Sequence, residues 1–226
     1  MTGLGSYADQ LGFVMLFPST ERMSRCWDYH SEASLMHGGG GDTNGLANMV
    51  VWALKQYGGD ATKVFVFGGS SGACETNLLA ATYPDVFNAG ASYSGTPAGC
   101  WAGASDSTPF TDDPTCLRGL KRYTAEQWGD IARNSYPGYQ GNRTRMFIAH
   151  GTADTVTPIA LLKQQLDQWS NVHSVAWTKN ETNIPARAWT KIAYGDGTKL
   201  VGYSVQGGGH IPPFQADETL RFFGLL

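Results

Sequence analysis

Residues 63–83, KVFVFGGSSGACETNLLAATY, constrain the fold of this chain more than any other stretch. They begin with VFVF, a short apolar run of β-branched and aromatic residues that predicts a buried parallel strand. The sequence GGSSG follows at residues 68–72, and then a run of helix formers that must end before Pro84. Strand, Gly-x-Ser-x-Gly and helix in this order are the context that a nucleophile elbow requires. We therefore predict an α/β fold in which Ser70 is a nucleophile.

The glycines of this motif have a steric purpose. Gly68 and Gly72 lack the Cβ atoms that would keep the strand and the helix apart in so tight a turn. The turn lifts the Ser70 hydroxyl above the edge of the sheet. The N–H groups at the start of the helix then point toward whatever the hydroxyl attacks, and the N–H of Ser71 is the first expected oxyanion-hole donor.

Chain length and net charge limit the number of domains and the kinds of partner that we expect. A chain of 226 residues suits one α/β domain, residues 1–226, that is long enough to bury a real core. The net charge of −3 gives no basic surface for nucleic acid, and no apolar run approaches the ~20 residues that cross a membrane. We expect neither nucleic acid nor a membrane as a partner.

Alternating apolar runs and helical patterns extend the prediction along the chain. After a helix that ends near Gln10, strands are expected at residues 13–17, 64–67, 89–93, 145–149 and 200–205, with further strands at 174–178 and 188–194 that pair or extend the sheet edge. Helices are expected from Asp42 or Thr43 to 56, with Leu46, Met49 and Ala53 on the buried face, and at 73–83, 124–134, 158–169 and 216–223. Residues 95–137 do not follow this alternation of strands and helices. We interpret them as an insertion at the carboxyl ends of the strands, where ligands bind in open α/β sheets.

A serine hydroxyl needs a base, and the base needs an acid to orient it. In elbow-type hydrolases these partners follow the serine in the order acid, then histidine. His210 follows a strand through three glycines and is the expected general base, whereas His173 lies in a polar run after a helix and is expected at the surface. Asp154 stands just past the strand at 145–149 and is the expected acid, with His150 orienting its loop.

The cysteines are too few for a disulfide scaffold and match no zinc spacing, so no metal site is expected. A bridge between Cys100 and Cys116, which flank a polar loop, would stabilise the fold by about 3 kcal/mol in the chain-entropy model. Glycosylation sequons begin at Asn142 and Asn180. Together with a low lysine content they favour a secreted protein. The chain shows no signal peptide, so we expect any export signal to lie outside it.

Several motifs together resemble one family. PST-x₅-CWD at 18–28, SLMHGGGGD at 34–42, GGSSGA at 68–73, SGTPAGC at 94–100, HGTAD at 150–154 and GGGH at 207–210 look like the fungal acetylxylan esterases and feruloyl esterases, carbohydrate esterases related to polyhydroxybutyrate depolymerases. The resemblance implies an α/β-hydrolase fold with a mostly parallel sheet flanked by helices, secretion, and no cofactor. It also implies hydrolysis of acyl esters on plant-wall xylan, and it matches Ser70, Asp154 and His210 to the catalytic triad.

The chain departs from the family pattern in two places. Family members begin with further strands and a loop that donates the second oxyanion N–H and usually holds the partner of the cysteine matching Cys26. We expect this chain to lack those strands and that loop. Cys74-Glu75 stands where the fungal enzymes tend to carry methionines. A carboxylate there either alters the pocket or faces solvent.

We expect a serine esterase that acts as a monomer and removes acetyl groups from xylan through an acyl-enzyme. A feruloyl esterase is the alternative, and a catalytically impaired fragment that binds polysaccharide is the alternative of another class. A serine peptidase is a third and weaker option. Trp27 and Trp101 are candidate contacts to the sugar or acyl group, although tryptophan more often packs in the core.

Overall fold

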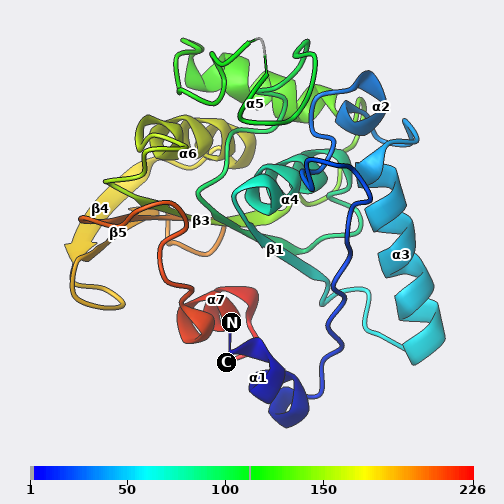
Figure 1. The fold of residues 1–226 in the computed structure, drawn as a ribbon. Coiled ribbons are helices and arrows are strands. Elements are labelled where there is room, and N and C mark those ends of the chain that lie inside the picture. The colour runs from blue at the N-terminus through cyan, green and yellow to red at the C-terminus, as the bar shows by residue number, and fades with distance from the viewer. Residues whose placement is uncertain (1–2, 112) are drawn as a thin grey trace.

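Six strands form one sheet at the centre of the computed structural model, which describes residues 3–111 and 113–226 (Figure 1). The strand order is β1-β2-β3-β6-β5-β4. The first four neighbours are parallel, and β5 and β4 continue the sheet antiparallel. The strands are β1 (Phe65–Gly69), β2 (Ala89–Tyr93), β3 (Arg145–Gly151), β4 (Trp177–Thr182), β5 (Trp189–Tyr194) and β6 (Leu200–Val205).

Helices cover both faces of this sheet. Those of the described residues are α1 (Leu4–Leu11), α2 (Glu32–Leu35), α3 (Asp42–Tyr57), α4 (Ser71–Thr82), α5 (Ala125–Asn134), α6 (Ala160–His173) and α7 (Ala216–Phe223). Helices α4, α5 and α6 lie on one side of the sheet and α7 on the other, with α1 next to α7 near the two chain ends (Figure 1). The mostly parallel sheet between helical layers confirms the predicted α/β-hydrolase class.

Alternating side chains of β3 connect the two halves of the core. Met146 and Ile148 pack with Leu166 and Trp169 beneath α6, and Phe147 belongs to the cluster on the opposite face. All three β3 side chains are fully buried. Because β3 is held from both sides, the loop that follows it starts from a rigid base.

Local sequence explains most element boundaries. Thr124 accepts a hydrogen bond from the N–H of Gln127, whose side chain accepts one from the N–H of Thr124, and this capping box starts α5 as predicted. Gly12 ends α1 in the left-handed conformation, close to the predicted helix end near Gln10. Helix α3 begins at Asp42, one of the two starting residues predicted, but neither Asp42 nor Thr43 occupies the N-cap position. Gly41 occupies that position, and the carboxylate of Asp42 is bonded to Arg22 and to the N–H of Asp28.

Two further predictions near the amino end were wrong. Residues 13–17 form no strand, and Val14 and Phe17 are 60% and 76% exposed, because no strand of the described chain pairs with this segment. On α3, Leu46 and Ala53 are buried as predicted, and only the prediction for Met49 was wrong, because its side chain is 52% exposed. An apolar pattern alone does not say which neighbour is present to cover it.

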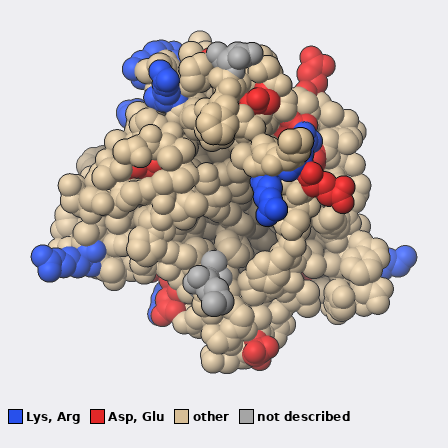
Figure 2. Space-filling view, viewed as in Figure 1, with Lys and Arg blue, Asp and Glu red and all other residues tan. Residues whose placement is uncertain are grey.

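Charged side chains are sparse on the face of the molecule seen in Figure 2, where a few groups of them, mainly at the upper left and at the right, interrupt a largely uncharged surface. No helix among the described residues is both long enough and apolar enough to span a membrane.

Candidate active site

The predicted elbow joins β1 to α4. Ser70 adopts φ 53° and ψ −119°, a strained conformation for a non-glycine residue. A Cβ on Gly68 would lie 2.3 Å from the backbone of Gly72, so the strand and helix approach each other only because residue 68 is glycine. The N–H of Ser70 donates to the carbonyl of Tyr93 at 2.9 Å, which ties the strained turn to the end of β2.

His210 lies in the loop after β6, and its Nε2 is 2.7 Å from Ser70 Oγ. The loop passes close to the one that follows β3, where a Cβ on Gly151 would meet the carbonyl oxygen of Gly208 at 2.2 Å. The N–H of Ala153 donates to that same carbonyl at 2.8 Å. The loops after β3 and β6 are therefore fixed to each other beside the elbow.

Asp154 occupies the loop after β3. Its carboxylate oxygens lie 2.9 Å and 3.1 Å from His210 Nδ1. The carboxylate also accepts hydrogen bonds from the N–H of Val156, from the N–H of Thr157 and from the Thr157 hydroxyl, the last at 2.7 Å. Burial raises the pKa of Asp154, but the hydrogen bonds from His210 and Thr157 outweigh burial and hold that pKa below its ordinary value.

An ionised Asp154 can only accept hydrogen bonds, so His210 must carry its proton on Nδ1. Nε2 is then a free acceptor for the Ser70 hydroxyl at 2.7 Å. The serine hydroxyl, the imidazole and the carboxylate lie within hydrogen-bond distance of one another, which is the geometry that a nucleophile, a base and an orienting acid require. The three sequence-predicted residues, far apart in the chain, lie together.

The other two histidines considered from the sequence have structural contacts. His150 is fully buried below Asp154, and its Nε2–H donates to the carbonyl of Thr157 at 2.7 Å. Burial lowers the pKa of His150, which favours the neutral ring. His173 ends α6 and donates to the carbonyl of Thr144 at 3.0 Å. The prediction that His173 is a solvated surface residue was therefore wrong. Burial lowers the pKa of His173 to about 4.

Ser71 begins α4, where the first N–H groups of a helix have no partner within it. Its N–H is one of these unpaired groups and directly follows Ser70 in the chain. Its hydroxyl accepts a hydrogen bond from the N–H of Trp27 at 2.9 Å, which holds the 26–30 loop against the elbow.

A small cavity of about 30 Å³ opens beside Ser70. Tyr29, Cys74, Trp101 and Leu117 are among the residues that line it, and the rings of Tyr29 and Trp101 meet edge to face at 5.3 Å. Trp101, one of the two tryptophans considered from the sequence, lines this cavity. Trp27 does not line this cavity, and its side chain packs against the core clusters below it.

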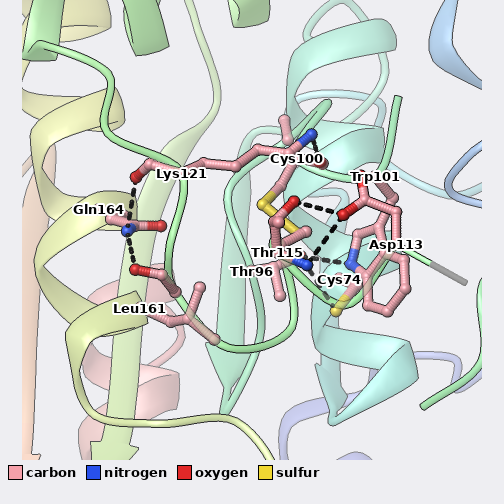
Figure 3. Close-up of a disulfide and its surroundings, with 12 residues drawn as sticks. Cys74, Thr96, Cys100, Trp101, Asp113, Thr115, Lys121, Leu161 and Gln164 are labelled. Carbon is pink, nitrogen blue, oxygen red and sulfur yellow. Dashed lines mark hydrogen bonds between the residues drawn. A yellow bond between two sulfur atoms is a disulfide. The ribbon is translucent and has the colours of Figure 1, made fainter. Parts of the chain in front are cut away.

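The insertion is anchored where it lines the cavity. The structure contains the disulfide between Cys100 and Cys116. Trp101 and Leu117, the residues after each cysteine, both line the cavity. In Figure 3 the indole N–H of Trp101 points to the hydroxyl of Thr96, which in turn bonds Cys74 on α4. Lys121 donates to the carbonyl of Cys100 across the base of this loop.

Several remaining residues have clear positions. Asn142 and Asn180 are both exposed, as glycosylation sites must be. Cys26 is a free, half-buried thiol, and Cys74 is free and buried. Burial raises the pKa of Cys74 to about 11. Among residues 3–111 and 113–226, no three His, Cys, Asp or Glu side chains group as a metal site.

Thr157 contacts both Asp154 and His210 and was not among the residues predicted from the sequence. Its hydroxyl lies 2.7 Å from Asp154 Oδ2 and 3.3 Å from His210 Nδ1. The signal for it was the spacing Asp-x-x-Thr, in which the carboxylate and the following N–H groups form a local turn.

Comparison with known proteins places the chain among esterases. A family model described as esterase PHB depolymerase matches residues 2–175. Feruloyl esterase B of Neurospora crassa is 50% identical over 225 residues, which cover 100% of this chain and 77% of that protein. Acetylxylan esterase A of Aspergillus oryzae is 40% identical over 220 residues, which cover 96% of this chain and 71% of that protein.

A solved structure shares the fold closely. The acetyl xylan esterase from Aspergillus awamori superimposes with a TM-score of 0.93 at 38% identity, and the match covers 100% of this chain and 82% of that one.

Proposed function

Since the chain belongs to the PHB depolymerase family of esterases, we propose that it is a serine carboxylic ester hydrolase that removes acetyl groups from xylan. The observation that carries the proposal is the relay from Asp154 through His210 to Ser70, with 2.9 Å and 2.7 Å between the interacting atoms. Relatives named acetylxylan esterase, one of them a solved structure at 38% identity, support the substrate class.

The first half of the reaction forms an acyl-enzyme. Ser70 Oγ attacks the carbonyl carbon of the ester while its proton passes to His210 Nε2. The carbonyl oxygen becomes an oxyanion, which the N–H of Ser71 and the positive end of α4 stabilise. His210 then gives its proton to the leaving sugar oxygen, the ester C–O bond breaks, and acetyl remains on Ser70.

The second half releases the acid. Water loses a proton to His210 and attacks the acetyl carbon, and the Ser70 oxygen leaves with the proton from His210. Asp154 stays ionised in both halves and stabilises the imidazolium, since its hydrogen bonds hold its pKa below the ordinary value although burial opposes them.

The size of the cavity beside Ser70 supports acetyl as the acyl group of the substrate. This cavity is small, about 30 Å³, and suits a small acyl group such as acetyl better than a bulky one. Trp101 closes it and is proposed as a contact to the acyl group rather than to the sugar.

A feruloyl ester is the second candidate substrate. The relative named feruloyl esterase B shares 50% of its aligned residues with this chain, more than the relatives named acetylxylan esterase share. A feruloyl group would need the side chains around Trp101 to move aside or would leave its ring outside the cavity.

The same proposal includes secretion and a monomeric, single-domain enzyme with glycans on Asn142 and Asn180. The fungal relatives and the exposure of both asparagines support an extracellular protein. The sparsely charged surface in Figure 2 suits a neutral polysaccharide.

Hydrolysis of acetylated xylan and of methyl ferulate tests these assignments. We expect acetate release at a higher kcat/KM than ferulate release, and loss of both activities in Ser70→Ala. Faster ferulate release would reverse the acyl preference. Equal background rates for wild type and Ser70→Ala would leave only the polysaccharide-binding alternative.

A further inference from the structure

The carboxyl end of β2 contacts all three loops that carry the proposed triad. The carbonyl of Tyr93 accepts the N–H of Ser70 at 2.9 Å. The next residue, Ser94, donates its N–H to the carbonyl of Ala149 at the end of β3, also at 2.9 Å. The Ser94 carbonyl accepts the hydroxyl of Thr157 at 3.4 Å, and Thr157 holds Asp154.

The Ser94 side chain adds the third loop. Ser94 Oγ accepts the N–H of Ile211, the residue after His210, at 3.1 Å. Ser94 is fully buried and Ile211 is 47% exposed, so this hydrogen bond ties the surface loop that carries His210 to a buried side chain at the end of β2.

Both ends of this hydrogen bond are strained. Ser94 has φ 60° and Ile211 has φ 58°, a region that costs a residue with a Cβ roughly 1–3 kcal/mol. Strain of this kind persists only where surrounding contacts hold it. Ile211 also lies over Gly69, where a Cβ would meet its side chain at 3.1 Å, so the loop has little freedom to move at the elbow.

We propose that Ser94 is a positioning residue for the hydrolysis, because its hydroxyl holds the Ile211 amide and thereby keeps His210 directed at Ser70. The inference rests on the proposed function. Ser94 contacts neither substrate nor His210 itself. Without the hydroxyl, the 207–211 loop loses its hydrogen bond to β2, and the imidazole samples positions in which Nε2 no longer meets Ser70 Oγ.

The decisive variant is Ser94→Ala, assayed with p-nitrophenyl acetate. We expect kcat to fall about 10- to 100-fold with KM within about twofold of wild type, because misplacement of a catalytic group by about 1 Å has effects of this order. The low-field proton resonance of the His210–Asp154 hydrogen bond should broaden or vanish in the same variant.

Ser92→Ala is the matched control. Ser92 is equally buried and lies two residues earlier, but its hydroxyl bonds Asn77 and Gln165 rather than a triad loop. It should lose thermal stability and keep its kcat per folded molecule and its low-field proton. If Ser94→Ala does not fold, Ser94→Gly gives the same test, since glycine relieves the strain at φ 60°.

Unchanged kcat in the folded Ser94 variant overturns the inference, and so does an equal loss in Ser92→Ala. Ser70→Ala in the same assay separates this failure from that of the proposed function. If Ser70→Ala is inactive and the Ser94 variant is fully active, only the positioning role fails. If Ser70→Ala retains wild-type activity, the proposed function fails.

Discussion

The carboxyl groups of Asp154 and Glu75 are surrounded so differently that their pKa values shift in opposite directions. Asp154 is bonded by His210, by Thr157 and by backbone N–H groups, and these contacts outweigh burial, which alone would raise its pKa. Glu75, on α4, is 2% exposed, and neither of its oxygens has a hydrogen-bond partner in the described structure. Burial and the nearby Asp42 and Asp28 raise the pKa of Glu75 well above its ordinary value, and Arg22 opposes them only in part. The residue faces the interior rather than solvent.

Glu75→Gln should therefore stabilise the protein at high pH. A raised folded-state pKa means that stability is complete below the unfolded pKa, about 4.3, and is lost as pH rises through the folded value. A neutral amide removes this loss. We expect the variant to gain about 1–2 kcal/mol in the free energy of unfolding at pH 8 and nothing at pH 4. Urea unfolding at both pH values measures it, and parallel pH profiles for the two proteins would contradict it.

Thr157→Val should slow the reaction. The substitution keeps the shape of the side chain and removes the hydroxyl that bonds Asp154 at 2.7 Å. We expect kcat to fall on the order of 10-fold, because the acid and through it His210 lose a fixed position. Thr82→Val, which loses a hydroxyl bonded to the Leu78 carbonyl on α4, is the control. Equal kcat values for all three proteins would show that the hydroxyl has no role in the reaction.

At the scale of elements, boundaries were predictable where a local interaction sets them. The helix start at Thr124 follows from its capping box, and β2 and β6 follow from short apolar runs between turn residues. The sequence could not show that residues 13–17 form no strand, because an apolar run does not reveal whether a partner strand lies beside it. Helix α2 escaped prediction because its four residues carry too little periodicity to detect.

Loss of the α5 cap should destabilise the fold without affecting catalysis. Thr124→Ala removes the acceptor for the N–H of Gln127 and should cost about 1 kcal/mol in the free energy of unfolding. Thr124→Ser retains the oxygen and should stay within a few tenths of wild type. Chemical denaturation of the three proteins tests the cap, and an equal loss in both variants would assign the effect to the threonine methyl group.

Removal of the disulfide should affect both stability and the cavity. Cys100→Ser with Cys116→Ser opens a loop with a sequence separation of 16 residues and should lower the free energy of unfolding by about 3 kcal/mol. Because Trp101 and Leu117 follow the two cysteines and line the cavity, the rate with p-nitrophenyl butyrate should rise relative to that with the acetate ester. An unchanged ratio of the two rates would mean that the cavity walls hold their positions without the bridge.

At the scale of the whole molecule, the topology explains why the catalytic candidates were predictable. Parallel strands end at one edge of a sheet, so residues that follow β1, β3 and β6 meet there although Ser70 and His210 are 140 residues apart. The contacts that hold these residues in place were harder to predict from the sequence. Ser94 and Ile211 are 117 residues apart, and no motif marks a hydrogen bond between a serine hydroxyl and a backbone amide of another loop. Sequence patterns identify the reacting groups, whereas the contacts that hold them depend on the assembled fold.

Covalent trapping of the nucleophile tests the central claim most directly. The protein is incubated with an aryl organophosphonate ester, which phosphonylates activated serines, and the modified residue is located by peptide mass spectrometry. We expect one label per chain on Ser70, formed at a rate that falls at least 100-fold in His210→Ala, because only the His210-bonded hydroxyl is activated. A label on another residue, or equal labelling of Ser70 in His210→Ala, would contradict it.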